Sequence, residues 1–276
     1  MAALPLRHER TLAEKFDAKR AAQLLGLARE TSHRIILGDA REMAEMTEPN
    51  SVHLVVTSPP YWTLKEYETS AGESQLGHVA DYARFQDELT KVWKRCFDLL
   101  TPGGRLCIVV GDVCIARRQA KRHYVVPLHA DIAVRCREIG FDYLTPILWY
   151  KIANARTEVS GNGSPFLGKP YEPNAIIKND VEYILLFRKP GGYRAPTQEQ
   201  RSLSMIEKEN HAQWFRAIWS DIPGSSRERG HPAPFPTEIA YRLISMFSFV
   251  GDTVLDPWAG TGWTARRAIA HGMRAV

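Results

Sequence analysis

Six residues from Thr57 to Trp62, Thr-Ser-Pro-Pro-Tyr-Trp, combine a hydroxyl, two prolines and two aromatic rings. Two consecutive prolines fix φ and remove two backbone N–H groups, so the carbonyls of Ser58 and Pro59 have little freedom to rearrange. Such a loop offers rigid acceptors for an amino group, and an aromatic ring beside them offers a flat surface for a planar ligand. A plain proline turn that closes a strand is the alternative interpretation of this segment taken alone.

A second group with chemical potential lies near the other end of the chain, in Asp256-Pro-Trp-Ala-Gly-Thr-Gly262. It follows a short apolar strand, and ligands of open α/β sheets bind at the carboxyl ends of strands. Its glycines allow a sharp turn and a close approach of the backbone to a ligand. The pattern is neither the G-x-G-x-x-G of a dinucleotide site nor a Walker loop, because Gly-Lys-Ser/Thr is absent.

The elements that must position these two loops are short apolar strands alternating with helices. Apolar runs predict strands at Arg34–Leu37, Ser51–Val56, Arg105–Val110, Tyr143–Tyr150, Glu182–Phe187, just before Asp256, and at Met273–Val276. Helical periods predict helices at Leu12–Ala28, Ala40–Met46, Asp81–Leu100, Pro127–Ile139, Thr237–Ser248 and from the glycine turn to His271. This alternation predicts an α/β fold with a mostly parallel sheet covered by helices on both faces.

The two motifs together resemble those of DNA amino-methyltransferases. Ser58-Pro59-Pro60-Tyr61 is similar to their catalytic motif, and Asp256–Gly262 is similar to their S-adenosyl-L-methionine motif, Asp-Pro-Phe-x-Gly-x-Gly, with Trp258 in place of Phe. The catalytic motif comes first and the cofactor motif last, as in the circularly permuted β group. The resemblance spans Arg34 to Val276 and is weakest over Lys151–Arg229. It implies a Rossmann-like, S-adenosyl-L-methionine-dependent methyltransferase fold.

The resemblance also implies the site residues. Ser58, Pro59, Pro60 and Tyr61 are the expected catalytic residues. Asp39 resembles the acidic position that reaches toward the adenine ring, and His231–Pro236 with Thr237 resembles the segment around the methionine end of the cofactor. The expected cofactor-binding residues are Asp39, Phe235, Pro236, Thr237, Asp256, Pro257, Trp258, Ala259, Gly260, Gly262 and Thr264. No metal is expected, because a sulfonium is already a strong electrophile.

The implied substrate is double-stranded DNA, with the target base flipped out of the helix. Serine at position 58, where the adenine-N6 branch usually has Asp, resembles the cytosine-N4 branch. Adenine-N6 methylation stays open, as does a non-catalytic DNA-binding fragment of the same fold. An RNA or small-molecule methyltransferase is a weaker alternative, because nothing resembles an RNA-binding module. A cognate restriction endonuclease is a possible partner, while recognition sequence and oligomeric state are not predicted.

Composition agrees with a soluble protein that meets a polyanion. The chain has 276 residues, a formal net charge of +5 and a pI of about 9.0. Its four cysteines have no C-x-x-C spacing, which favours reduced, buried thiols. No apolar run reaches transmembrane length and the N-terminus has no signal-peptide core, so a cytoplasmic location without a membrane partner is expected.

The chain divides into four predicted parts: a leader at 1–32, the catalytic half of the domain at 33–190 with an excursion at 151–180, a candidate target-recognition insert at 191–230, and the cofactor-binding half at 231–276. Basic residues from Arg117 to His123 are interpreted either as a solvated loop or as phosphate contacts. Within the insert, basic residues with Trp214 and Trp219 suit a nucleic-acid surface, or the tryptophans are packed beneath it.

The last predicted strand is cut short. The family expects it to end in an acidic residue that binds the ribose hydroxyls, and the sequence stops at Val276 before that position. The resemblance leaves two interpretations: the sequence is a truncated product, or the acid is supplied by another part of the chain. We expect truncation, and with it weakened cofactor binding.

Overall fold

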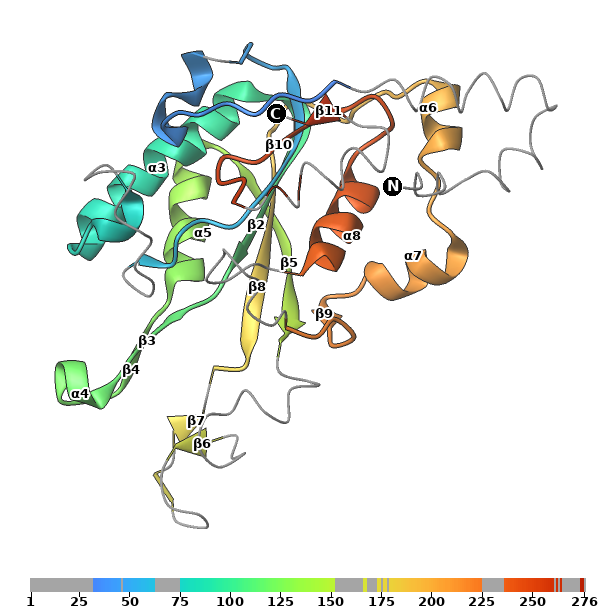
Figure 1. Ribbon diagram of the computed structural model, residues 1–276. Coiled ribbons are helices and arrows are strands. Elements are labelled where there is room, and N and C mark those ends of the chain that lie inside the picture. The colour runs from blue at the N-terminus through green and yellow to red at the C-terminus, as the bar shows by residue number, and fades with distance from the viewer. Residues whose placement is uncertain are drawn as a thin grey trace.

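A computed structural model describes residues 32–45, 47–62, 75–151, 166–167, 173–174, 176–177, 179–224, 236–260, 262, 264 and 274–275. Seven strands form one sheet in the order β11-β10-β1-β2-β8-β5-β9 (Figure 1). Their bounds are β1 Val52–Thr57, β2 Leu100–Val110, β5 Asp142–Tyr150, β8 Val181–Arg188, β9 Ile218–Trp219, β10 Thr253–Leu255 and β11 Arg274–Ala275.

The sheet is mostly parallel, as predicted. Strands β11, β10, β1 and β2 pair in parallel, and β9 is parallel to β5. The exception is β8, which runs antiparallel to both of its neighbours, β2 and β5. Because of this reversal, the amino end of β8 lies at the same edge as the carboxyl ends of the other strands.

Helices cover both faces of the sheet (Figure 1). On one face lie α3 (Tyr82–Leu99) and α5 (Leu128–Ile139), and on the other lies α8 (Thr237–Phe247). The remaining helices are η1 (Ala40–Glu45), η4 (Leu76–His78), α4 (Arg117–Ala120), α6 (Gln198–Leu203) and α7 (Lys208–Trp214).

Strand β1 shows why its sequence is almost wholly apolar. Val55 packs into the hydrophobic cluster beneath α3 and α5, whereas Leu54 and Val56 pack into the cluster beneath α8. All three side chains are fully buried. A strand buried on both faces needs apolar residues at consecutive positions, and this is the pattern that the sequence displays.

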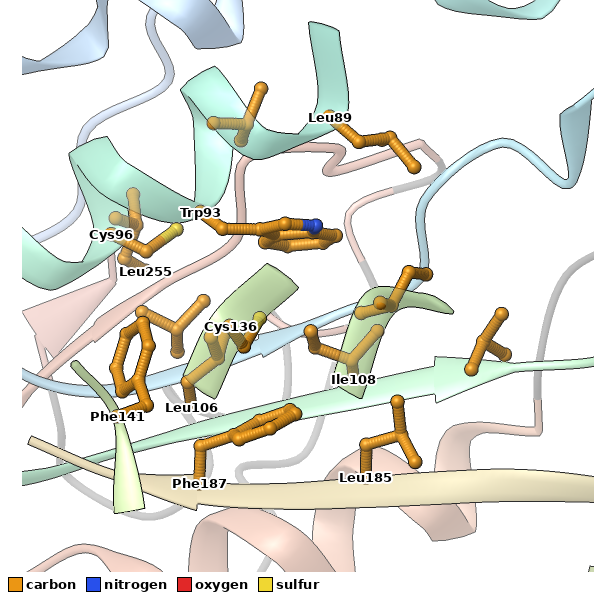
Figure 2. Close-up of a cluster of buried hydrophobic side chains, with 14 of the residues drawn as sticks. Leu89, Trp93, Cys96, Leu106, Ile108, Cys136, Phe141, Leu185, Phe187 and Leu255 are labelled. Carbon is orange, nitrogen blue, oxygen red and sulfur yellow. The ribbon is translucent and has the colours of Figure 1, made fainter. Parts of the chain in front are cut away.

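The larger cluster joins α3 and α5 to the centre of the sheet. In Figure 2, Leu89 and Trp93 of α3 lie above Leu106 and Ile108 of β2. Phe187, on the neighbouring strand β8, belongs to the same cluster. The predicted helix from Asp81 is confirmed, and the Asp81 carboxylate caps it by accepting a hydrogen bond from the backbone N–H of Arg84 at 2.7 Å. The predicted end of α5 at Gly140 is also confirmed, since that glycine has φ 117°.

Three of the four cysteines, Cys96, Cys107 and Cys136, are buried and Cys114 is half-buried, and all four are free thiols. Burial raises the pKa of the Cys107 thiol to about 12, which keeps it protonated and unreactive near neutral pH. The prediction of reduced, buried thiols is therefore confirmed.

The predicted strand at Arg34–Leu37 is wrong. These residues form no strand, and the side chains of Ile35 and Leu37 are almost fully exposed. The apolar triplet misled the prediction because burial needs a neighbouring strand and a covering face, which the triplet itself does not supply. The predicted start of β2 at Arg105 is also shifted, since β2 begins at Leu100 and Thr101–Gly104 forms an irregularity within it.

Two regions interpreted as irregular contain small strands. The basic cluster is not a loop: β3 (Val113–Ile115) and β4 (Tyr124–Val126) form an antiparallel hairpin with α4 at its tip. Within the predicted excursion at 151–180, β6 (Phe166–Leu167) pairs with β7 (Ile176–Ile177). Both hairpins project from the same end of the molecule in Figure 1.

The tryptophans of the predicted insert at 191–230 are packed. Trp214 and Trp219 are 3% and 1% exposed, and the guanidinium of Arg242 in α8 lies over both rings. The Trp219 indole also donates a hydrogen bond to the backbone carbonyl of Trp214 at 2.9 Å. These rings therefore support the insert from within and are not an exposed stacking surface.

The part of the chain that the structure describes has no helix with both the length and the apolar character needed to cross a bilayer.

The position of Leu106 at the centre of the larger cluster allows a stability test. Leu106→Ala leaves a cavity in a fully buried site, and we expect the free energy of unfolding to fall by about 2–5 kcal/mol in urea denaturation. Leu37→Ala removes the same atoms from a fully exposed side chain and should change it by less than about 0.5 kcal/mol. Equal losses in the two variants would contradict the packing described here.

Candidate functional site

The two sequence motifs lie side by side at one edge of the sheet. Strands β1 and β10 pair in parallel, with Val55 opposite Leu255, so the loops that follow them leave the sheet together. The hydroxyl of Thr57 donates a hydrogen bond of 2.6 Å to Oδ1 of Asp256, across 199 positions of sequence. The last residue of β1, directly before the Ser-Pro-Pro-Tyr loop, is thus joined to the first residue of the Asp-Pro-Trp loop.

Asp256 is held by the start of both loops. Its Oδ1 also accepts the backbone N–H of Trp258 at 3.1 Å. Burial raises the pKa of this carboxyl above its ordinary value, whereas the bonds from the Thr57 hydroxyl and the Trp258 amide lower it. The side chain therefore serves to shape the turn, and the two donors offset part of the cost of burying its charge.

Tyr61 is fixed at the same edge by an acidic residue that the sequence analysis missed. The Tyr61 hydroxyl donates to Oε2 of Glu182 at 3.1 Å, and Nζ of Lys151 donates to Oε1 of Glu182 at 2.9 Å. The Ser58 hydroxyl lies 3.5 Å from the Tyr61 hydroxyl. Pro59 is buried, whereas Ser58, Pro60 and Tyr61 are half-buried and stay accessible.

Gly111, directly after β2, makes room for this contact. A Cβ on Gly111 would lie 3.2 Å from Cε2 of Tyr61 and 3.2 Å from Cγ of Glu182. A side chain there would require Tyr61 and Glu182 to shift by a few tenths of an ångström. The carboxyl ends of β1 and β2 and the amino end of β8 therefore converge on one small polar group.

Trp62, the second aromatic residue of the motif, has a different role from Tyr61. It adopts a left-handed backbone conformation with φ 48°. Its indole N–H donates to the backbone carbonyl of Val79 at 3.0 Å, and its ring packs edge-on against Tyr82, with 5.1 Å between ring centroids. Trp62 thus ties the loop to the start of α3.

The cofactor motif makes an open turn. Gly260 and Gly262 have φ 52° and 77°, a left-handed conformation that glycine adopts most readily. Ala259 and Gly260 are exposed, and a Cβ on Gly262 would meet no described atom within 4 Å. Trp258 packs edge-on against Trp93 of α3, with 5.3 Å between ring centroids, so an aromatic ring here anchors the turn to the core. Pro257 is half-buried and Thr264 is buried.

Of the other expected cofactor-binding residues, Asp39, Pro236 and Thr237 are described by the structure. The Asp39 carboxylate accepts hydrogen bonds from Nε and the backbone N–H of Arg41, and the Arg41 side chain lowers the pKa of this carboxyl. Pro236 and Thr237 lie at the start of α8. Phe235 lies outside the described residues. The role of these residues toward a cofactor stays a prediction.

Comparison with known proteins agrees with this arrangement. The family model described as DNA methylase, which covers N6 and N4 methyltransferases, matches residues 52–276. The chain belongs to this DNA methylase family. The match contains both motifs and all strands of the central sheet.

This methylase is similar to two curated archaeal proteins. It is 39% identical to the type II methyltransferase M.MjaI of Methanocaldococcus jannaschii, over 87% of this chain and 84% of that protein. It is 33% identical to the type II methyltransferase M.MthZI of Methanothermobacter thermautotrophicus, over 90% of this chain and 72% of that protein.

Two solved structures share the methylase fold. TTHA0409 of Thermus thermophilus, solved in complex with S-adenosyl-L-methionine, is 53% identical, with a TM-score of 0.71 over 89% of this chain and 86% of that chain. PvuII DNA methyltransferase, named as cytosine-N4-specific, is 18% identical, with a TM-score of 0.60 over 90% of this chain and 82% of that chain. The second likeness shows the Rossmann-like fold alone.

The raised pKa of Asp256 generates a pH-dependent prediction. A carboxyl whose pKa is higher in the folded state costs stability once the pH rises above its ordinary value, and the cost is complete above the folded pKa. Asp256→Asn does not titrate and keeps an acceptor for Thr57. The difference in melting temperature, variant minus wild type, should therefore increase as the pH rises above the ordinary carboxyl value of 3.8.

The control is Asp87→Asn, which alters an exposed carboxylate on α3. Its carboxylate lies 3.1 Å from the Arg135 guanidinium at the surface, so it reports the effect of removing one carboxylate away from the two loops. A difference for Asp256→Asn that falls as the pH rises would contradict a raised pKa for this carboxyl.

Proposed function

We propose that the protein transfers a methyl group from S-adenosyl-L-methionine to the exocyclic amino nitrogen of a base flipped out of double-stranded DNA, with N4 of cytosine as the target. The observation that carries this proposal is the Thr57–Asp256 hydrogen bond, because it joins the Ser-Pro-Pro-Tyr loop to the glycine turn. A methyl acceptor on the first loop and a methyl donor on the second would then be neighbours.

The glycine turn suits the cofactor. Gly260 is exposed, and a Cβ on Gly262 would meet no described atom within 4 Å, so the described part of the turn leaves room for a ligand to approach its backbone. The residues proposed to hold S-adenosyl-L-methionine are Asp39, Phe235, Pro236, Thr237, Asp256, Pro257, Trp258, Ala259, Gly260, Gly262 and Thr264. The relative TTHA0409 was solved with this molecule, which supports the assignment. The cofactor supplies an electrophilic methyl group.

The Ser-Pro-Pro-Tyr loop is proposed to activate the acceptor nitrogen. The lone pair of an amino group on cytosine or adenine is delocalised into the ring, which makes the nitrogen a weak nucleophile. The Ser58 hydroxyl and the Pro59 carbonyl would accept hydrogen bonds from the two N–H groups of the amino nitrogen. These bonds would localise its lone pair toward the methyl donor. Holding nitrogen, carbon and sulfur in line would lower the entropic part of the barrier. The N–C bond would form as the S–C bond breaks, leaving a neutral thioether, and the nitrogen would then release one proton to water.

Tyr61 is proposed as the platform for the flipped base. Flipping costs a few kcal/mol, and stacking on an aromatic ring returns about 1–3 kcal/mol. The bond from its hydroxyl to Glu182 fixes the orientation of the ring before the base arrives. Glu182 is therefore proposed as a positioning residue, and Lys151 balances its charge.

Cytosine is preferred over adenine because residue 58 is serine. Both bases present an amino donor beside a ring-nitrogen acceptor, so the choice needs a direct measurement. Because the relatives are named as type II methyltransferases, we include a cognate restriction endonuclease as a partner and the cytoplasm, with its DNA, as the site of action.

The deciding experiment incubates the protein with labelled S-adenosyl-L-methionine and unmodified plasmid DNA of mixed sequence. Transfer of label to DNA, followed by sequencing that separates N4-methylcytosine from N6-methyladenine, tests the reaction and the base in turn. No label in DNA under conditions where the cofactor binds would leave a non-catalytic DNA-binding protein. Label found on adenine alone would move the protein to the N6 branch.

Ser58→Ala tests the proposed acceptor. Loss of a hydrogen bond made to the reacting group should lower kcat by at least about 100-fold. Binding of S-adenosyl-L-methionine, measured by calorimetry, should stay unchanged. The matched control is Ser51→Ala, at the opposite end of β1, where the hydroxyl donates a hydrogen bond to the backbone carbonyl of Glu48. An unaltered methylation rate in Ser58→Ala would refute the role given to this serine.

Glu182 offers a separate test of positioning. Glu182→Gln can still accept one bond but not charge-assisted bonds from both Tyr61 and Lys151, so we expect kcat/KM to fall about tenfold, and Glu182→Ala more. The fluorescence of a 2-aminopurine placed at the target position should report weaker capture of the flipped base. Glu138→Gln, on the exposed side of α5, is the control. Lower stability with unchanged capture and kcat/KM would make Glu182 a structural residue only.

A further inference from the structure

The β3–α4–β4 hairpin concentrates the positive charge of the chain. Between Val113 and Val126 the sequence has four Lys or Arg residues and no Asp or Glu, so this segment carries +4, against +5 for the whole chain. The four cations are Arg117, Arg118, Lys121 and Arg122. In Figure 1 the hairpin stands away from the helices and the sheet, with α4 at its tip.

These cations are available to a partner. All four are exposed, and the described residues place no carboxylate within ion-pair distance of any of them. Arg122 lies over the ring of Tyr124, 5.0 Å from its centroid, which stiffens one side of the hairpin. Lys121 has a left-handed backbone with φ 61°, so the turn itself holds a lysine at the tip.

The base of the hairpin is firmly held at the candidate site. Asp112, which precedes β3, accepts the backbone N–H of His129 at 3.2 Å, and its Oδ1 lies 2.6 Å from Nδ1 of the same residue, just after β4. This pair closes the neck of the hairpin. Val113 is buried in the core beside it. Gly111, which directly precedes Asp112, is the glycine against which Tyr61 and Glu182 pack.

We propose that this hairpin is an arm that contacts the sugar-phosphate backbone of duplex DNA beside the flipped base. The inference rests on the proposed function and specifies which surface holds the duplex. Exposed cations on a rigid support, with no carboxylate partner among the described residues, are what a polyanion with regularly spaced phosphates requires. Contacts of this kind position the duplex and carry no sequence information, so the arm would orient DNA while other residues read it.

A membrane surface is a less suitable partner for the same charges. Interfacial segments combine basic residues with a continuous apolar face that enters the lipid. The hairpin exposes Tyr124 and Val125, while Val113 faces the core and its other exposed residues are polar. Duplex DNA needs no apolar face and accounts for the charge alone.

The test uses the full chain with Arg117, Arg118, Lys121 and Arg122 all replaced by Gln. Binding of an unmodified duplex is measured by fluorescence anisotropy at several salt concentrations without cofactor. Each phosphate contact contributes about 0.9 to the slope of log K against log salt, so we expect the slope to decrease by about 3 to 4 and the affinity to fall at least about tenfold near 0.1 M salt. Cofactor binding and melting temperature should not change.

The matched control removes the same charge from the outer surface of α3 and α5, as Arg84→Gln, Lys91→Gln, Lys94→Gln and Arg137→Gln. These four side chains are exposed as well. If the hairpin variant keeps the wild-type slope of log K against log salt, the proposal that the hairpin contacts DNA is wrong. An equal decrease of this slope in both variants also contradicts the proposal. A hairpin variant that binds duplex DNA normally but loses binding to vesicles of phosphatidylserine also overturns it in favour of a membrane.

Failure of the arm and failure of the proposed function give different results. If the wild-type protein transfers methyl groups and the hairpin variant binds and methylates DNA equally well, only the proposed role of the hairpin is wrong. A wild-type protein that binds DNA with a steep salt slope lost in the hairpin variant, yet transfers no methyl group, supports the arm and overturns the reaction.

Discussion

The structure depends on the parallel pairing of β1 with β10. Only this neighbour relation brings Thr57 within hydrogen-bonding distance of Asp256, and only a shared strand direction puts both loops at the same edge. The Asp256 carboxylate is half-buried, and donors close by reduce the cost of removing its charge from water. The bond therefore links the end of β1 directly to the turn that follows β10, although 199 positions of sequence, including α3, α5 and β8, separate the two residues.

The reversal of β8 adds the second constraint. In a wholly parallel sheet, Glu182 at the amino end of β8 would lie at the edge opposite Tyr61. Because β8 runs against both β2 and β5, Glu182 reaches the carboxyl edge, where Tyr61 and Lys151 meet its two oxygens. Gly111 leaves the space that this contact needs. The antiparallel direction of β8 therefore has a consequence for the site. It allows a residue within a strand, Glu182, to lie at the carboxyl edge of the other strands.

The sequence predicted correctly those elements whose ends depend on residues close by in the chain. Asp81 and Gly140 mark helix ends through caps that involve residues a few positions away, and both were predicted correctly. The apolar stretch Arg34–Leu37 was not, because its state depends on neighbours that are distant in sequence. Glu182 was missed for the same reason, since its bond to Tyr61 spans 121 positions. The basic hairpin lacks glycine at its turn and places Lys121 in the left-handed region, so the usual turn signal is absent.

Charge is distributed unevenly along the candidate edge. The acidic groups there are bonded within the protein: Glu182 to Lys151 and Tyr61, Asp112 to His129, and Asp256 to Thr57 and the Trp258 amide. The cations of the hairpin have no such partners among the described residues. A polyanion approaching this edge therefore meets carboxylates whose charge is already offset by local donors, while the positive field of the hairpin extends over about a Debye length, near 10 Å at 0.1 M salt. A chain with a modest net charge presents a strongly positive surface in one place because four cations and no acidic residue lie between Val113 and Val126.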